Sequence, residues 1–80
     1  SVCVKSDKSA HCIRMDFEDF PYLGIWSKYT GKPTNYVCIE PWSTLPDTAY
    51  LDHALENKIG VRCLKPGESE TLTFSTTITE

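Results

Sequence analysis

Residues 11–19 read HCIRMDFED, and this stretch decides the class of fold. Apolar Ile13, Met15 and Phe17 stand at every second position. The charged positions that alternate with them are Arg14, Asp16 and Glu18. A period of two is typical of a β-strand that buries one face and leaves the other in water. The stretch therefore predicts a half-buried strand.

Strand-like runs continue on both sides of this stretch. Val2 and Val4 alternate with other residues near the N-terminus, and the apolar runs FPYLGIWS (20–27) and NYVCIEP (35–41) follow it. The final residues, 71–80, read TLTFSTTITE and alternate over their whole length. Such runs, separated by Gly, Pro, Ser, Thr and Asn, predict further strands joined by loops.

The pattern between residues 41 and 60 is less regular. Three apolar residues recur there at a spacing of four and a glycine follows them, which predicts a short helix that ends at the glycine. These residues are Leu51, Leu55, Ile59 and Gly60. Residues 61–64, VRCL, then predict a short strand, and Pro66-Gly67 predicts a turn after it.

These runs together set the fold class. About five or six antiparallel strands predict an all-β protein, namely an antiparallel β-sandwich or part of one. At 80 residues the chain is at most one domain. Since so many apolar strands need a partner sheet to cover them, we expect residues 1–80 to be an incomplete piece of a single β-sandwich domain.

Charge and hydropathy argue against two classes of partner. The chain carries 8 Lys and Arg against 11 Asp and Glu, a formal charge of −3, and has no basic cluster. We therefore expect no nucleic acid partner, because phosphate recognition needs clustered positive charge. The longest apolar run, YLGIW at 22–26, is far too short for a membrane span, so we expect no membrane partner.

The four cysteines are spread along the chain at positions 3, 12, 38 and 63. No CxxC pair exists, so we expect no metal site. Each cysteine lies in a β-like run, where a reduced cysteine behaves as a small hydrophobic residue. This favours free structural thiols and a cytoplasmic protein. The alternative is a secreted interaction domain stapled by disulfides.

The run NYVCIEPW, residues 35–42, carries a carboxylate that the strand pattern does not explain. Alternation places Glu40 on the same face as Cys38 and opposite to Ile39. Pro41 restricts Glu40 to an extended backbone, and Trp42 follows Glu40 onto its face if the strand continues.

A carboxylate flanked by the aromatic rings of Trp26 and Trp42 fits a sugar site. Aromatic rings stack on the apolar face of a pyranose, and the carboxylate accepts hydrogen bonds from hydroxyl groups. A solvent-facing Glu40 at a strand end and a Trp26 packed in a core fit the same pattern. The two histidines, His11 and His53, stand at no catalytic or metal-ligand spacing and are expected to be structural.

A family resemblance adds to this. The order FPYLGIWS, CIEPW and LKPGES, followed by a threonine-rich last strand, resembles the C-terminal end of the aldose 1-epimerase (galactose mutarotase-like) family, in particular its bacterial LacX-type branch. The resemblance covers nearly the whole chain. It implies that the chain is part of a large antiparallel supersandwich.

The resemblance also implies a function. Members of the family interconvert the α and β anomers of aldohexoses and need no cofactor. Glu40 matches the general base of the family, whose general acid is a histidine upstream of this segment. Neither His11 nor His53 matches that acid. The resemblance therefore implies that these residues alone are inactive and that the rest of a parent chain completes the fold and the site.

One alternative function remains open at this point. A non-catalytic carbohydrate-binding β-sandwich module would use the same face, with Trp26 and Trp42 as sugar contacts, and would need no acid.

Overall fold

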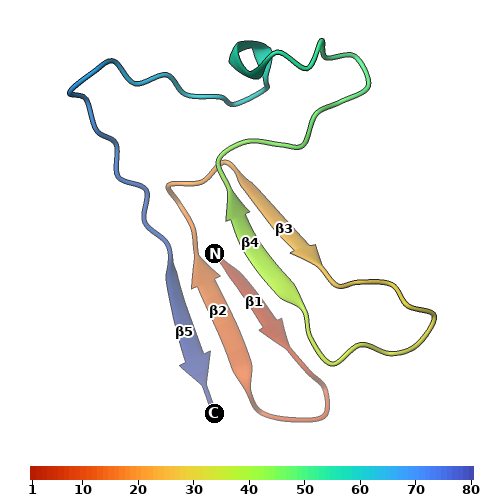
Figure 1. Ribbon diagram of the computed structural model, residues 1–80. Helices are drawn as coiled ribbons and strands as arrows, with labels where there is room; N and C mark the ends of the chain where they lie inside the picture. The colour runs from red at the N-terminus through yellow and green to blue at the C-terminus, as the bar shows by residue number, and fades with distance from the viewer. The chain divides into compact units, whose positions relative to one another are not determined.

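Antiparallel strands make up nearly all the regular structure of the computed structural model, which describes residues 1–80 (Figure 1). The five strands form one sheet of three, in the order β1-β2-β5, and one sheet of two, β3-β4. The chain divides into two compact units, residues 1–19 with 70–80, and residues 20–69. The all-β, antiparallel class predicted from the sequence is confirmed, as expected for a β-sandwich fragment.

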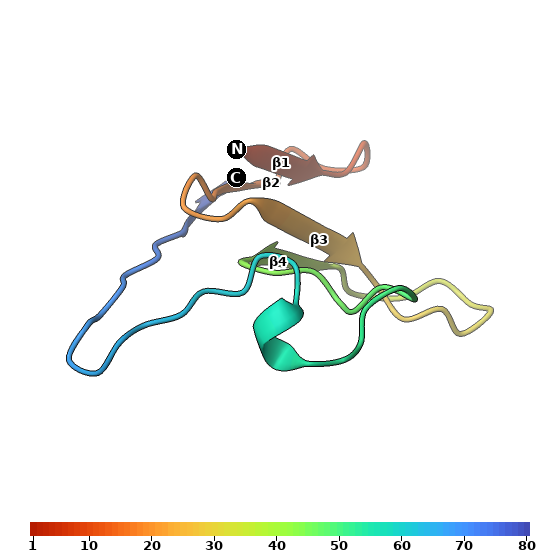
Figure 2. The same ribbon diagram turned by 90° about the horizontal axis from the view of Figure 1, so that it is seen from above.

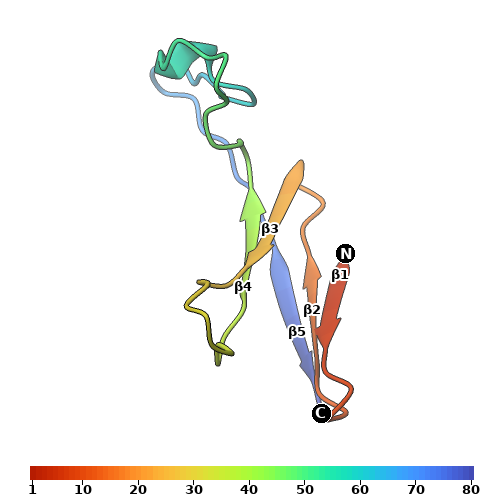
Figure 3. The same ribbon diagram turned by 90° about the vertical axis from the view of Figure 1, so that its right-hand side faces the viewer.

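The first unit is built on β2 (Cys12–Asp16), which lies between β1 (Val2–Lys5) and β5 (Ser75–Thr79) (Figure 3). The register pairs Ile13 with Val4 and Ile78, and Met15 with Val2 and Thr76. Residues directly opposite each other share a face, so these apolar side chains lie on one face. The alternation predicted for residues 11–19 is therefore confirmed within β2, while Phe17 and Glu18 lie beyond the end of the strand.

Burial on that face is slight. Met15, at 6% exposure, is the single buried hydrophobic side chain of the chain. Large apolar side chains stay exposed in both units; they include Ile13, Ile25, Trp26, Val37, Phe74 and Ile78. A sheet is normally stable only when its apolar face is covered by another layer. That these strands need further partner surface stays a prediction.

One hydrogen bond joins distant parts of the first unit. The backbone N–H of Thr73 donates to Oδ2 of Asp19 over 2.8 Å, across 54 residues of sequence. Asp19 is exposed in the turn after β2, and its carboxylate holds the segment that leads into β5.

The second unit contains the hairpin of β3 (Tyr22–Trp26) and β4 (Cys38–Trp42). The loop between them is closed by the backbone N–H of Lys28, which donates to the Tyr36 hydroxyl over 3.0 Å. β4 continues through Pro41 to Trp42, which is the condition under which the sequence placed Trp42 on the face of Glu40. A strand with one neighbour leaves every second N–H without a strand partner, so a residue without an N–H fits there.

The segment after β4 differs from its prediction. Only a single 3-10 turn, η1 (Leu55–Asn57), forms where a helix ending at Gly60 was expected (Figure 2). His53 has a φ of 64°, in the left-handed region, so no right-handed helix can run through it. Ala54 and Lys58, which flank the turn, are both extended.

Two further expectations concern residues 61–80. The short strand predicted at 61–64 is absent, and the last strand is shorter than the predicted 71–80, because β5 covers Ser75–Thr79. The turn at Pro66-Gly67 is confirmed. Glu68 donates its N–H to the carbonyl of Lys65 over 3.0 Å, and Gly67 takes the positive φ of 84° that a type II turn requires. The structure contains no helix with the length and hydrophobicity of a membrane span.

All four cysteines are free, and two of them are neighbours in the first unit. Desolvation raises the pKa of the Cys12 thiol, and a hydrogen bond with the Cys3 thiol raises it further, against an opposing effect of Lys5. The thiolate is the reactive form, so a raised pKa slows alkylation at pH 8.

We expect iodoacetamide to label Cys12 more slowly than the exposed Cys63 in the native protein at pH 8, as measured by peptide mass spectrometry. The matched control is Cys3→Ser, which removes the neighbouring thiol and is expected to speed the labelling of Cys12. Equal labelling of Cys12 in both proteins would contradict the role of Cys3.

Candidate functional site

The residues singled out from the sequence lie on one face of the β3–β4 hairpin. The register places Glu40 opposite Gly24, Trp42 opposite Tyr22, and Trp26 opposite Cys38. Directly opposed residues and residues two apart share a face of an antiparallel pair. Glu40, Trp42 and Trp26 are therefore together on one side of the hairpin.

The other side of the hairpin is apolar. Ile39 and Pro41 of β4 lie opposite Ile25 and Leu23 of β3. The alternation predicted for Cys38, Ile39 and Glu40 is confirmed. Tyr36 and Val37, which the sequence placed in the same strand, precede β4, so their alternation with it does not hold.

A hydrogen bond joins Glu40 to Trp42. The indole Nε1–H of Trp42 donates to Oε2 of Glu40 over 3.0 Å, and both residues are half-buried. The bond forms because β4 stays extended through Pro41, which brings residues 40 and 42 to the same face. It occupies one carboxylate oxygen and leaves Oε1 able to accept a further hydrogen bond.

Gly24 makes room for this arrangement. A Cβ atom at Gly24 would lie 2.7 Å from Cζ2 and 2.9 Å from Cε2 of Trp42, so the indole ring lies over the bare backbone of β3. Sequence reasoning missed Gly24. The available signal was a glycine inside the strand-like run YLGIW, which often marks a close approach.

Trp26 lies on the same face but in a different environment. Its surface is 48% exposed, as part of the apolar surface that these strands leave uncovered. An exposed ring on the face of Glu40 is open to a ligand, as a stacking platform must be. Its contact with sugar stays a prediction.

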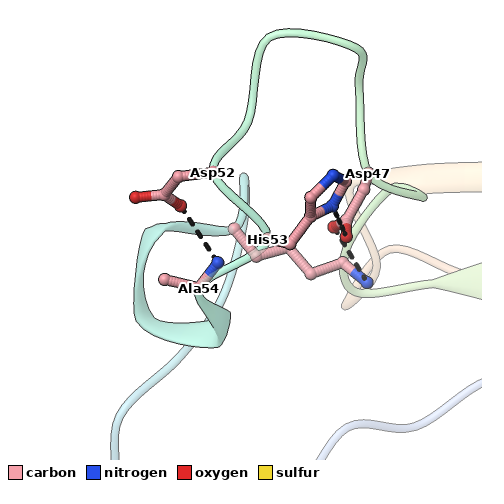
Figure 4. Close-up of polar contacts among 5 residues, drawn as sticks. Asp47, Asp52, His53 and Ala54 are labelled. Atoms are coloured by element: carbon pink, nitrogen blue, oxygen red, sulfur yellow. Dashed lines mark hydrogen bonds and ion pairs between the residues drawn. The ribbon is translucent and has the colours of Figure 1, made fainter.

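The segment after β4 holds a second polar cluster, shown in Figure 4. Nδ1 of His53 lies 3.3 Å from Oδ2 of Asp47, and Nζ of Lys58 lies 4.0 Å from the other oxygen of the same carboxylate. The His53 side chain is 75% exposed. It lies at the surface with a carboxylate partner, as expected for a structural histidine.

Asp52 fixes the turn beside His53 (Figure 4). Its carboxylate accepts a hydrogen bond from the backbone N–H of Ala54 over 3.0 Å. It also accepts one from the side-chain amide of Asn57 over 2.9 Å. These bonds, the Ala54 bond first, lower the pKa of Asp52. At the end of the segment, Gly60 has a positive φ, and a Cβ there would lie 2.9 Å from the Ser43 carbonyl oxygen. Residues 43–60 therefore return to the end of β4.

His11 belongs to the first unit and lies at the end of the β1–β2 turn. It is exposed, and its backbone N–H donates to Oγ of Ser9 over 3.2 Å. No group of three or more His, Cys, Asp or Glu side chains gathers in a way that could hold a metal ion.

Two known proteins are similar in sequence to nearly the whole chain, the β3–β4 hairpin included. The chain is 35% identical over 78 residues to the chromosomal protein LacX of Lactococcus lactis subsp. lactis, and equally identical to the plasmid-encoded protein LacX. The chain is similar to LacX. The alignments include 98% of the chain but 25% of each LacX protein, so the chain spans about a quarter of their length. No family model and no solved structure matches the chain.

Proposed function

We propose that the chain is the C-terminal part of an aldose 1-epimerase, in which Glu40 is the general base. The observation that carries this proposal is the half-buried Glu40 carboxylate, held by the Trp42 indole on the hairpin face that also bears Trp26. The similarity to LacX supports it further, as does the resemblance of CIEPW to the base-bearing strand of that family.

The chemistry suits such a carboxylate. Mutarotation begins when a base removes the proton from the C1 hydroxyl while an acid protonates the ring oxygen. The ring opens to the aldehyde, which rotates about the C1–C2 bond and closes again as either anomer. Glu40 would accept the C1 proton through the oxygen that Trp42 does not occupy, and would return a proton on closure.

The substrate class is an aldohexose such as glucose or galactose, and the reaction needs no cofactor. The acid must protonate the ring oxygen while Glu40 takes the C1 proton, so the two groups must flank the anomeric centre together. Neither histidine of this chain is proposed for that role, because neither His11 nor His53 matches the acid of the family that the sequence resembles. The rest of the parent protein supplies the acid, and the 80 residues alone are inactive.

Polarimetry tests the proposed activity directly. Fresh α-glucose and α-galactose are dissolved with the purified full-length protein, and the decay of optical rotation is followed against a buffer control at equal pH. We expect decay faster than the spontaneous reaction for at least one of the two sugars. Decay at the spontaneous rate with both sugars would contradict the proposal.

A carbohydrate-binding module without catalysis is the second candidate. The observation that favours it is the half-exposed Trp26 beside a carboxylate, which by itself requires only binding. Calorimetry separates the two candidates. Sugar binding by a full-length protein that leaves the rate of mutarotation unchanged would support the module and exclude the enzyme.

A further inference from the structure

We propose that Trp42 is a positioning residue, which serves the reaction by orienting the Glu40 carboxylate and not by stacking on the sugar. This inference rests on the proposed function, since it assigns a task to a neighbour of the proposed base. It also gives the two tryptophans of the hairpin different roles, whereas the sequence predicted that both contact the sugar.

The hydrogen bond is the first support. A glutamate has three rotatable side-chain bonds, and its carboxylate samples many directions unless a partner holds it. The Trp42 Nε1–H can only donate, and it lies 3.0 Å from Oε2 of Glu40. A donor that faces an ionised acceptor makes one of the stronger hydrogen bonds in proteins. The bond directs the second oxygen, Oε1, away from the indole.

The second argument is the packing of the Trp42 indole against β3. Three atoms of the six-membered ring of Trp42 lie within 3.2 Å of the place where a Gly24 Cβ would stand. The ring therefore packs against the backbone of β3 at Gly24, which is the residue directly opposite Glu40 in the register. An indole has two side-chain torsions, so a ring seated in this way is a rigid donor.

The contrast with Trp26 is the third support. Trp26 shares the face of Glu40, yet it is half-exposed, and no hydrogen bond from its indole to Glu40 is present. All residues of β4, Trp42 included, are half-buried. The exposed Trp26 ring is suited to stack on a ligand, and the packed Trp42 ring is suited to orient Glu40.

The test is Trp42→Phe in the full-length protein, which keeps an aromatic ring and removes the donor. Hydrogen bonds to charged groups are worth enough that kcat is expected to fall about tenfold or more, with KM changed by less than about twofold. Tyr50→Phe is the control, because it also leaves a phenyl ring and removes a hydrogen-bond donor, at a side chain of the same unit that is 98% exposed. Its kcat is expected to stay near that of the parent.

A spectroscopic signature accompanies the kinetics. The Trp42 indole proton, assigned by its disappearance in Trp42→Phe, is expected to be shifted downfield and to exchange slowly with water. In Glu40→Ala both properties are expected to be lost, while the Trp26 indole proton is unchanged. This measurement uses the folded parent and Glu40→Ala, so it decides the matter even if Trp42→Phe fails to fold.

The outcomes separate this inference from the proposed function. If Glu40→Gln loses activity but Trp42→Phe keeps its kcat and raises KM, Trp42 is a sugar platform and the positioning role is overturned. An indole proton that does not respond to Glu40→Ala overturns it as well. If Glu40→Gln itself keeps full activity, the proposed function fails, whatever the indole signal does.

Discussion

The variant Glu40→Gln of the full-length protein is expected to lose most of its mutarotase activity. The amide keeps the size of the side chain and can still accept from Trp42 through its oxygen, but it cannot accept the C1 proton. A positioned general base typically contributes about 10²- to 10⁴-fold to the rate, so kcat is expected to fall by that factor. Because the fold and the indole contact are preserved, KM is expected to change little.

Polarimetry at several enzyme concentrations measures this loss, since only the catalysed part of the decay scales with concentration. The matched control is Glu56→Gln, the same substitution at an exposed glutamate of η1 in the same unit. This control is expected to retain the parent rate. Full activity of Glu40→Gln would contradict the assignment of Glu40 as the base. An equal loss of activity in Glu40→Gln and Glu56→Gln would indicate a general effect of charge.

The second large effect is expected for Gly24→Ala. The added Cβ would lie 2.7 Å from Cζ2 of Trp42, so the indole must move and its hydrogen bond to Glu40 is strained or lost. Overpacking of this kind typically costs about 1–3 kcal/mol of unfolding free energy. We expect kcat to fall about tenfold, as in Trp42→Phe, because the same orienting contact is removed.

A double-mutant cycle supplies the control. In a Trp42→Ala background the added methyl meets no ring, and Gly24 does not have a positive φ that alanine would strain. There Gly24→Ala is expected to be neutral, or to stabilise by about 0.4–1 kcal/mol through the unfolded chain. Urea unfolding and polarimetry of the four proteins measure the coupling. An equal penalty in both backgrounds would show that the ring is not what Gly24 accommodates.

Period-two alternation predicted the faces of β2 and β4, although it did not set where the strands begin and end. It worked for β2 because Ile13 and Met15 share a face with partners on both neighbouring strands. It also brought Glu40 to the same side of β4 as Cys38. Strand pairing follows the side-chain period, so a local pattern carries this information without knowledge of the rest of the fold.

Other features depend on contacts that a local pattern does not contain. The strand passes through Pro41 because β4 has one neighbouring strand, which is a property of the sheet. The helix expected to end at Gly60 is interrupted by the left-handed backbone of His53, which no spacing of leucines reveals. The role of Gly24 appears only once the register sets it opposite Glu40 and under Trp42.

The order in which the first sheet can form has a consequence for the growing chain. The β1–β2 hairpin is synthesised before residues 20–69 of the second unit, but β5, which covers the other edge of β2, is synthesised after them. Asp19 and Thr73 are 54 positions apart, a stretch that takes about 3–10 s to translate at typical rates. During that time β2 exposes an unpaired edge and an apolar face, the combination that invites aggregation. The first sheet of a nascent chain is therefore completed only by β5, and chaperone capture is expected to concentrate in the interval before that strand emerges.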